Sequence, residues 1–301
     1  MAVQSPRLGA LLERARTRSS LRTAVVWPFD EQSLRATVEA AELGFIVPVL
    51  VGDGEKLRAL AAHERIGITD FELVNVAGPK AAASAAVALA LRSKVSAIMK
   101  GTLHTDDLMH AVVSEPGLRG EGRMSHVLVA DATTYHKLLF ITDAAVNVAP
   151  DLETKREIVQ NAIDLAHALG IGTPKVAVLA AVETVNPHLP ATLDAAALCK
   201  MAERGQITGG ILDGPLAFDD AISREVACEK GIDSPVAGDV DILVVPELDA
   251  GNMLFKELEY LAGAECAGLV VGARVPVILT GRADREPARI ASIALGVLAA
   301  R

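Results

Sequence analysis

The chain has 301 residues, of which 51% are hydrophobic and 22% are charged, and its formal net charge is −9. That length and composition predict a folded protein with room for two ordinary domains, and the negative charge argues against nucleic acid or an anionic membrane as a partner. Aromatic residues make up only 3%, so the core must consist of Ala, Val, Leu and Ile, which favours buried parallel sheets in an α/β fold.

Cysteine use and the N-terminal segment predict the cellular location. Cys199, Cys228 and Cys266 are odd in number and widely spaced, which indicates neither a disulfide framework nor a zinc site. Residues 1–20 are basic and amphipathic, but they lack an apolar core of signal-peptide length, and no apolar run approaches the ~20 residues of a membrane span. We expect a cytoplasmic protein, with organelle targeting as an alternative because the start is rich in Arg and Ser.

Strand-like runs alternate with helical segments in the first part of the chain. The runs "TAVVW", "IVPVLVG", "FELVNV" and "AIMKG" are followed by helix-period segments at 30–43, 53–63, 79–92 and 104–113. This βαβα order predicts a doubly wound parallel sheet. The segment "EPGLRGEGRMSH" at 115–126 interrupts the order with glycines, and we expect a loop at a domain edge.

A second alternating series follows that loop. The strands "HVLVAD" and "LLFITDA" precede a predicted helix at 152–169, which Asp151 can cap at its start and Gly170 can end. The runs "KVAVLAAV", "GGILDG", "DILVVP", "CAGLVVGA" and "VPVIL" then alternate with helices at 191–203, 250–262 and 284–299. We predict two α/β units with a cleft between them, the last helix returning to the first unit.

Polar clusters follow several strands, at the edge where open α/β sheets bind ligands. The cluster in "MKGTLHTDD" comprises Lys100, Thr102, His104, Thr105 and Asp107. An anion site and an ordinary helix start capped by Thr105 explain it equally well, because both use the same geometry. The next cluster comprises Arg119, Arg123, Ser125 and His126. Its arginines suit phosphate, although a charged surface loop is the alternative.

Three further clusters also lie at strand ends. They are Asp143 and Asn147 in "ITDAAVNVAPD", Asp213 in "LDGPLAFDDA", and Arg282 and Asp284 in "LTGRADR". Asp143 and Asn147 belong either to a turn network or to a substrate site, because polar groups beside an apolar run need partners. An Asp-Gly turn is common, so Asp213 is weak evidence by itself. Arg282 either binds phosphate or is, with Asp284, an ordinary polar residue at the N-terminus of a helix.

Metal and nucleotide sites find little support in the sequence. His104 and His110 are six residues apart, which places them on different faces of a helix. Cys199 lies among Leu and Met on a predicted helix and fits a core residue better than a nucleophile. The stretch "GDGEK" lacks the spacing of a phosphate-binding loop.

Taken together, these segments resemble the phosphate acetyltransferase and phosphate butyryltransferase family. The matching segments are "MKGTLHTDDLM", "LFITDAAVNVAPDLETK", "VQNAIDLAHALGI", "LAAVETVNP", "TLDAAALCKMA", "GQITGGILDGPLAFDDAIS", "SPVAGDVDILVVPELDAGNML" and "ARVPVILTGRAD". They follow the family's order over roughly residues 20–300 and look closest to the acetyltransferases.

The resemblance implies two three-layer α/β/α domains with mostly parallel sheets, residues 1–132 with 274–301 and residues 133–273, and an active-site cleft between them. It implies a homodimer that transfers an acyl group, acetyl by preference, between CoA and inorganic phosphate. CoA is then a co-substrate beside acyl phosphate, and neither a bound cofactor nor a metal is expected. Because these substrates are anionic, an acidic protein must concentrate arginines and helix N-termini at its site.

The resemblance also assigns roles. Arg282 is expected to hold phosphate, with Thr102 and Ser125 as further donors, while the CoA thiolate attacks the acyl phosphate directly. Three aspartates are candidates for the thiol base or for orienting other groups: Asp143, Asp213 and Asp284. The remaining substrate-binding candidates are Lys100, His104, Thr105, Arg123, His126, Asn147, Asn252 and Gly281.

Two positions depart from the family pattern. Gly281 stands where the family has a serine before the arginine, and Ala288 stands where some acetyltransferases have an aspartate proposed as the thiol base. A catalytically weakened paralogue that binds CoA or acyl phosphate is therefore an alternative, as is an acyltransferase that prefers butyryl or propionyl groups. A metal-dependent dehydrogenase is less favoured, because no convincing GxGxxG follows a strand.

Overall fold

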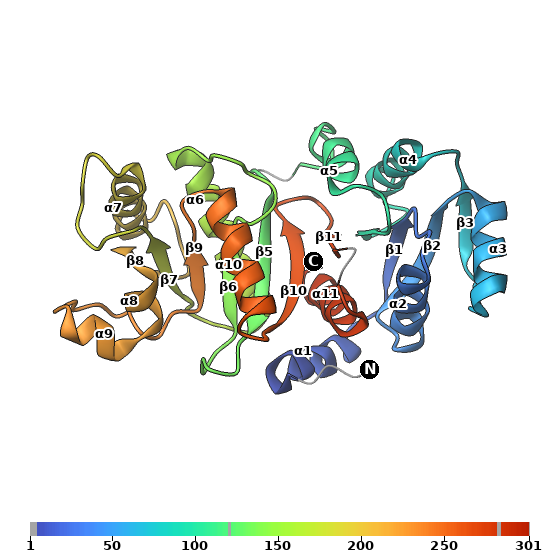
Figure 1. The fold of residues 1–301 in the computed structure, drawn as a ribbon. Helices are drawn as coiled ribbons and strands as arrows, with labels where there is room; N and C mark the ends of the chain where they lie inside the picture. The colour runs from blue at the N-terminus through green and yellow to red at the C-terminus, as the bar shows by residue number, and fades with distance from the viewer. Residues whose placement is uncertain (1–4, 120–121, 282–283, 301) are drawn as a thin grey trace. The chain divides into compact units, whose positions relative to one another are not determined.

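The computed structural model describes residues 5–119, 122–281 and 284–300. They form two compact units, unit 1 of residues 1–122 with 267–301 and unit 2 of residues 123–266 (Figure 1). The expected α/β class is confirmed, since helices cover both faces of mostly parallel sheets. The domain boundaries expected from the sequence, 1–132 with 274–301 and 133–273, stay a prediction.

The strands of unit 1 follow the order β3-β2-β1-β4-β11-β10. Their bounds are β1 (Leu21–Val26), β2 (Ile46–Gly52), β3 (Glu72–Asn75), β4 (Ala97–Lys100), β10 (Glu265–Val271) and β11 (Val277–Ile278). Neighbours in this order are parallel up to β11, and β10 is antiparallel to β11. The carboxyl ends of β1, β4 and β11 therefore meet at one edge of the sheet.

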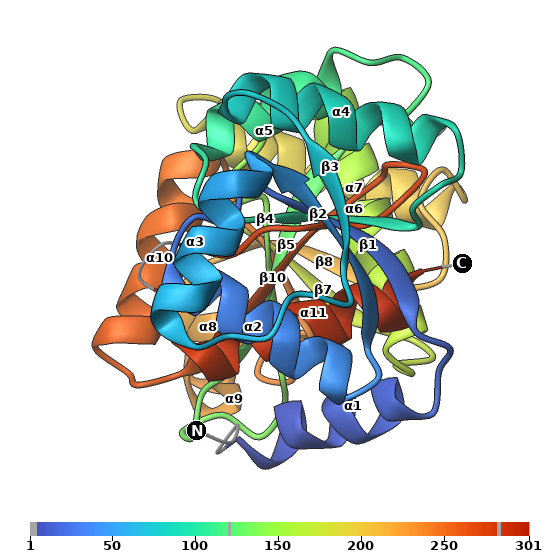
Figure 2. The ribbon, with the colours of Figure 1, turned by 90° about the vertical axis from the view of Figure 1, so that its right-hand side faces the viewer.

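The helices of unit 1 are α1 (Pro6–Arg16), α2 (Glu31–Glu42), α3 (Gly54–Glu64), α4 (Pro79–Leu91), α5 (Thr105–Val113) and α11 (Glu286–Ala299). Figure 2 shows α4 and α5 on one side of the strands and α2 and α11 on the other. The last helix, α11, packs against α1 and α2, as expected. The expected cap of α5 is wrong by one residue, because His104 is the N-cap and Thr105 is the first helical residue, with no side-chain capping bond.

The strands of unit 2 follow the order β5-β6-β9-β7-β8. Their bounds are β5 (Ser125–Asp131), β6 (Leu139–Thr142), β7 (Lys175–Leu179), β8 (Ile211–Leu216) and β9 (Ile242–Val244). β5 and β6 form an antiparallel pair, and β6, β9, β7 and β8 are parallel to their neighbours. Asp143 follows β6 directly, at the carboxyl edge of these parallel strands.

The helices of unit 2 are α6 (Leu152–Ala168), α7 (Pro190–Glu203), α8 (Phe218–Ile222), α9 (Arg224–Glu229) and α10 (Leu248–Tyr260). Figure 1 shows α6 and α7 on one side of the strands and α8 and α9 on the other. The start of α6 is confirmed, because Asp151 accepts a hydrogen bond from Thr154 N at 2.9 Å, and Gly170 ends it with φ 88°. Among the described residues, no helix has the length and apolarity to cross a membrane.

Gly101 brings the loops after β1 and β4 into close contact. Its N–H donates to Val26 O at 2.9 Å, and Thr102 N donates to Trp27 O at 2.9 Å. A Cβ at position 101 would lie 2.5 Å from Val26 O and 2.7 Å from Trp27 O, which are backbone atoms that a side-chain rotation cannot move. The polar edge of unit 1 therefore depends on a glycine at this position.

We expect Gly101→Ala to lower the free energy of unfolding by about 2–3 kcal/mol, because the methyl group must push two backbone segments apart. Urea unfolding of the purified protein measures this change. Gly67→Ala is the matched control, since a Cβ at position 67 meets nothing within 4 Å and its backbone is not left-handed. Equal stability of the two variants would contradict the close-contact interpretation.

Candidate functional site

The carboxyl edge of unit 1 holds a buried lysine. Lys100 ends β4, is only 3% exposed, and donates from Nζ to Thr280 O at 2.9 Å and to Gly101 O at 3.2 Å. Thr280 returns a bond from Oγ1 to Lys100 O at 3.2 Å. The ammonium group therefore joins the end of β4 to the segment that follows β11.

Thr102 has a local partner for its hydroxyl group. Its Oγ1 donates to Trp27 O at 2.8 Å and accepts from Phe29 N at 3.3 Å. We expected the Thr102 hydroxyl to donate to phosphate, but its proton is used in the bond to Trp27 O, which holds the loop after β1. In this geometry Thr102 shapes the edge, and direct donation to a substrate would require the Trp27 bond to break.

Gly281 and Asp284 close a tight turn after β11. Gly281 N donates to Asp284 Oδ2 at 2.5 Å, and Asp284 N donates to Gly281 O at 3.3 Å. The Asp284 carboxylate also occupies the space that a side chain at position 281 would need. A Cβ atom at position 281 would overlap with the oxygen of this carboxylate. The glycine and the aspartate are therefore sterically linked. Arg282, the predicted phosphate ligand, lies outside the described residues.

Arg289 is the residue of this edge that the sequence analysis missed. It lies in the first turns of α11, is 1% exposed, and donates to Gly281 O and Asp284 O at 2.9 and 3.2 Å. An arginine at the start of the apolar segment "RIASIALGVL" was a signal for it, because a charged residue on a buried helix face needs a reason. Its hydrogen-bond partners could not be predicted from the sequence, because the carbonyl groups that it binds lie on a loop without a periodic pattern.

Asp143 organises the loop between β6 and α6. Its Oδ1 accepts from Ala145 N and Val146 N at 2.9 and 3.0 Å, and its Oδ2 accepts from Asn147 N and Nδ2 at 3.1 and 2.6 Å. Asp143 is 3% exposed. Because the loop itself supplies four donors, this carboxylate holds the backbone rather than offering a free base. Of the two sequence interpretations, the geometry favours the turn network.

Two asparagines hold the start of β5, Asn147 from the loop after β6 and Asn161 from α6. Asn147 Nδ2 donates to Met124 O at 2.9 Å. Asn161, on α6, donates from Nδ2 to Arg123 O at 2.8 Å and to Ser125 Oγ at 3.0 Å. Ser125 is fully buried. Asn161 was not predicted, although it lies on α6 one turn from the buried Ile158, because its partners are distant in sequence.

A pocket of about 290 Å³ opens beside this loop. It is lined by residues 146–151 together with Arg123 and Thr154. The Arg123 side chain is exposed, and its charge contributes to lowering the pKa of Asp151, after the larger effect of the hydrogen bonds from Thr154. The pocket therefore combines the Arg123 cation, the Asp151 carboxylate, the Asn147 amide and the apolar residues 148–150.

Asn252 lies near the same loop on α10. Its Nδ2 is 3.4 Å from Ala144 O, a long hydrogen bond, and its side chain is exposed. The neighbouring Gly251 permits this approach, because a Cβ there would lie 2.7 Å from Asp143 O. α10 therefore packs closely on the loop after β6 through a glycine that the sequence analysis did not single out.

The other predicted residues occupy varied surroundings. His104 is exposed at the start of α5, and Asp107 lies 3.8 Å from the Lys80 ammonium. Arg119 donates from Nε to Val113 O at 3.2 Å, which ties the loop after α5 to its helix. His126 is 7% exposed in β5.

Comparison with known proteins gives the family. A model described as "Phosphate acetyl/butaryl transferase" matches residues 79–297. A Rhizobium meliloti protein named phosphate acetyltransferase is 54% identical over 296 residues, 98% of this chain and 94% of that protein. The chain belongs to the phosphate acetyl/butyryl transferase family. The resemblance stated from the sequence is thereby confirmed.

Two further relatives agree with this family. A Clostridium acetobutylicum protein named phosphate butyryltransferase is 41% identical over 291 residues, 96% of this chain and 97% of that protein. The crystal structure of a branched-chain phosphotransacylase from Enterococcus faecalis V583 matches with a TM-score of 0.80 and 28% identity, covering 93% of this chain and 99% of that one. The acetyl/butyryl transferase fold therefore extends over nearly the whole chain.

Asp213 and Cys199 form a separate group in this family member. Asp213 lies in the edge strand β8, three strands from β6, so about 14 Å separates the two strands. Its Oδ1 accepts from Gly214 N at 2.8 Å. Burial raises the pKa of the Cys199 thiol to about 12, and the carboxylates of Asp213 and Glu203 add to the rise. Asp213 is not brought together with Asp143, and Cys199 is a poor nucleophile.

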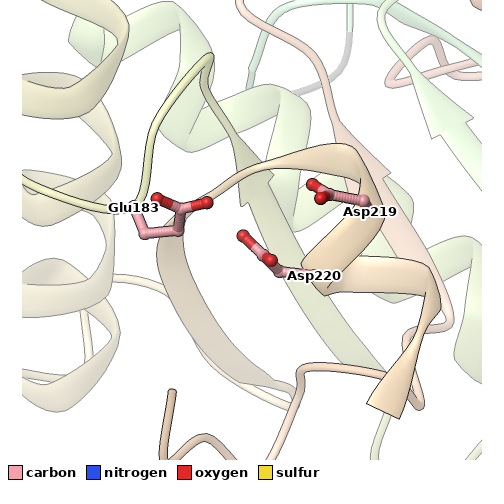
Figure 3. Close-up of side chains that lie close together, drawn as sticks. All are labelled: Glu183, Asp219 and Asp220. Carbon is pink, nitrogen blue, oxygen red and sulfur yellow. The ribbon is translucent and has the colours of Figure 1, made fainter. Parts of the chain in front are cut away.

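An acidic group that would suit a metal ion already holds a lysine. Figure 3 shows Glu183 on the loop after β7 and Asp219 and Asp220 on α8. The Lys230 Nζ lies 2.7, 2.9 and 2.9 Å from their carboxylates. The Lys230 ammonium supplies positive charge to this group, while burial, together with Glu183 and Asp219, still raises the pKa of Asp220. The cluster therefore joins α9 to α8 and the loop after β7.

We expect the Lys230 cluster to stabilise the protein in a pH-dependent way. The hydrogen bond from Lys230, with a further one from Asp220, lowers the pKa of Glu183 from 4.5 to about 2. A lowered carboxyl pKa contributes stability above pH 4.5 that is lost as the pH falls toward 2. Glu183→Gln should therefore be less stable than the unaltered protein at pH 7, and the difference should shrink below pH 4.5.

Urea unfolding at several pH values checks this expectation. Glu203→Gln is a matched control, because it removes an exposed carboxylate that pairs with Lys200 on the surface of α7. Such a surface pair contributes little to stability. A stability difference for Glu183→Gln that stays constant from neutral to acid pH would contradict the assigned role.

Proposed function

We propose that the protein is a phosphate acyltransferase that moves an acyl group reversibly between CoA and inorganic phosphate, with acetyl as the preferred group. The observation that carries this proposal is the identity to a protein named phosphate acetyltransferase along nearly the whole chain. The buried cations at the carboxyl edge of unit 1 support it, since acyl phosphate is anionic and the chain as a whole is acidic. The homodimer implied by the resemblance stays a prediction.

In the proposed reaction the CoA sulfur attacks the carbonyl carbon of acyl phosphate. A free thiol has a pKa near 8.5, so a few per cent is thiolate at neutral pH, and nearby positive charge raises that fraction. The S–C bond forms and the C–O bond to phosphate breaks, so inorganic phosphate leaves with the bonding electrons. Donors that meet the carbonyl oxyanion and the leaving phosphate lower the barrier.

We assign phosphate binding to Arg282 and the shaping of its turn to Asp284. Asp284 is part of this turn, and its carboxylate accepts a hydrogen bond from Gly281 N. Asp143 is saturated by its own loop, which argues against a base role for it. Direct contacts of Ser125 or His126 with a substrate stay predictions.

We propose that the pocket beside the Asp143 loop, residues 143–150, receives part of CoA. The Arg123 guanidinium suits a phosphate group of CoA, and the apolar residues 148–150 suit the aliphatic portion of CoA. Asn147 and Asn252 would supply amide contacts. CoA here is a co-substrate, and the proposal requires no resident cofactor.

Initial rates with acetyl, propionyl and butyryl phosphate test the proposed function. We expect acyl-CoA formation with all three and a kcat/KM for acetyl phosphate at least about tenfold above that for butyryl phosphate, the discrimination that a methylene or two can provide. A preference for butyryl phosphate would support the butyryl alternative. Failure to form acyl-CoA from any of them would support the weakened paralogue.

The same assays distinguish direct attack from a covalent acyl-enzyme. Direct attack predicts sequential kinetics, and Cys199→Ala should retain most of the rate because this thiol stays protonated. A ping-pong pattern, or loss of activity in Cys199→Ala with the fold intact, would rule out direct attack.

We expect Gly281→Ser to lower activity rather than raise it. A serine side chain would displace the Asp284 carboxylate from Gly281 N, which removes a charge-assisted hydrogen bond. Loss of such a bond costs about 1.5–3 kcal/mol, or about tenfold to a hundredfold in kcat/KM if the turn holds the transition state. Asp284→Ala should give a similar loss, and the double variant should be no worse than either single one.

Asp284→Asn is the control for a base role. The amide keeps an acceptor oxygen for Gly281 N but cannot take a proton from the CoA thiol. A turn-shaping Asp284 predicts substantial activity in this variant, whereas a base predicts a loss as large as that of Asp284→Ala. Independent, additive losses in Gly281→Ser and Asp284→Ala would contradict the steric link.

A further inference from the structure

Arg289 is a buried cation whose described partners are all neutral. Its Nε donates to Asp284 O at 3.2 Å and its NH2 group to Gly281 O at 2.9 Å. Its NH1 group donates to Thr280 Oγ1 at 3.3 Å and to Ser33 Oγ, on α2, at 3.4 Å. Each acceptor is a carbonyl or a hydroxyl oxygen, and the residue is 1% exposed.

Two features make this position costly for a positive charge. In the part of the chain that the structure describes, no carboxylate lies within ion-pair distance of the guanidinium, and Asp284 meets it through its carbonyl while its carboxylate binds Gly281 N. Arg289 also lies in the first turns of α11, where the helix dipole already provides positive potential. A buried charge without an opposite charge is destabilising, so hydrogen bonding alone is a poor reason for an arginine here.

The guanidinium acts on a single short segment. Its bonds reach Thr280, Gly281 and Asp284, which flank position 282 on both sides. Lys100 Nζ binds the carbonyl of the same Thr280. Two buried cations from β4 and α11 therefore bind the backbone of adjacent residues, Thr280 and Gly281.

We propose that Arg289 is a positioning residue for the anionic reactant: it holds both ends of the Thr280–Asp284 turn and supplies a buried positive charge that attracts the phosphoryl group. This inference rests on the proposed function, because it assumes that the turn meets phosphate. The missing opposite charge is then provided by the reactant. An anion at the turn lowers the cost of burying the guanidinium, and by linkage the guanidinium tightens the binding of the anion.

The test separates the charge of Arg289 from its hydrogen bonds. Arg289→Gln removes the charge and keeps a polar side chain, whereas Arg289→Lys keeps the charge and loses the planar set of donors. Arg35→Gln is the matched control, since it removes one charge from an exposed arginine on α2 that pairs with Glu31. Isothermal titration of each full-length protein with inorganic phosphate gives the affinity, and initial rates give KM for acetyl phosphate and for CoA.

We expect Arg289→Gln to weaken phosphate binding and to raise KM for acetyl phosphate by about tenfold, the size of a charge interaction across roughly 12 Å at an effective dielectric constant of about 20. KM for CoA should change much less. Arg289→Lys should bind phosphate within about threefold of the unaltered protein but show a lower kcat, because its turn is held less well. Arg35→Gln should match the unaltered protein in every measurement.

A purely structural arginine gives a different result. Arg289→Gln would then melt at a lower temperature while the folded fraction bound phosphate normally, and that outcome overturns the inference. If Arg289→Gln does not fold, Arg289→Lys decides: a lowered kcat with retained phosphate affinity supports the inference, and unchanged kinetics overturn it. No measurable phosphate binding by the unaltered protein also overturns it.

Failure of the proposed function leaves a distinct signature. If the unaltered protein forms no acyl-CoA but binds phosphate, and Arg289→Gln weakens that binding, the role of Arg289 stands and the acyltransferase proposal fails. If the unaltered protein forms acyl-CoA and Arg289→Gln has an unchanged KM for acetyl phosphate, only the inference about Arg289 fails.

Discussion

The polar groups at the carboxyl ends of the buried strands lose their contact with water, and both units are built around that constraint. In unit 1 the Lys100 ammonium and the Arg289 guanidinium bind the backbone and hydroxyl oxygens around Thr280. In unit 2 the Asp143 carboxylate binds the N–H groups of the loop that follows it. At these two edges the buried charged side chains thus bind loop backbone, which holds the loops in place.

The sign of the buried charge differs between the two edges, and this difference has chemical consequences. Asp143 is negative, but four donors from its own loop satisfy it, so little of its charge is left for another molecule. Arg289 is positive and donates to carbonyl and hydroxyl oxygens, so no opposite charge among its described partners cancels its field near Gly281 and Asp284. An acidic protein can attract an anionic substrate locally in this way while its overall charge stays negative.

Prediction from the sequence succeeded where periodicity and capping residues act locally. Helix α6 was predicted with its Asp151 cap and Gly170 end because these signals lie beside each other in the chain. The short helices α8 and α9 were missed, since five or six residues carry no clear period. The antiparallel pairing of β5 with β6 was missed as well, because strand direction depends on how the chain folds back and not on the composition of either strand.

The sequence by itself determined the α/β class, the family and the strand ends that carry polar residues, because these depend on local patterns and on the order of matching segments. Only the tertiary structure decided what each polar residue does. It showed that Thr102 and Asp143 are occupied by neighbouring backbone, that Gly281 leaves room for the Asp284 carboxylate, and that Arg289 reaches the turn after β11. Hydrogen-bond partners are chosen by distance in space, and a single sequence does not encode that distance in any local pattern.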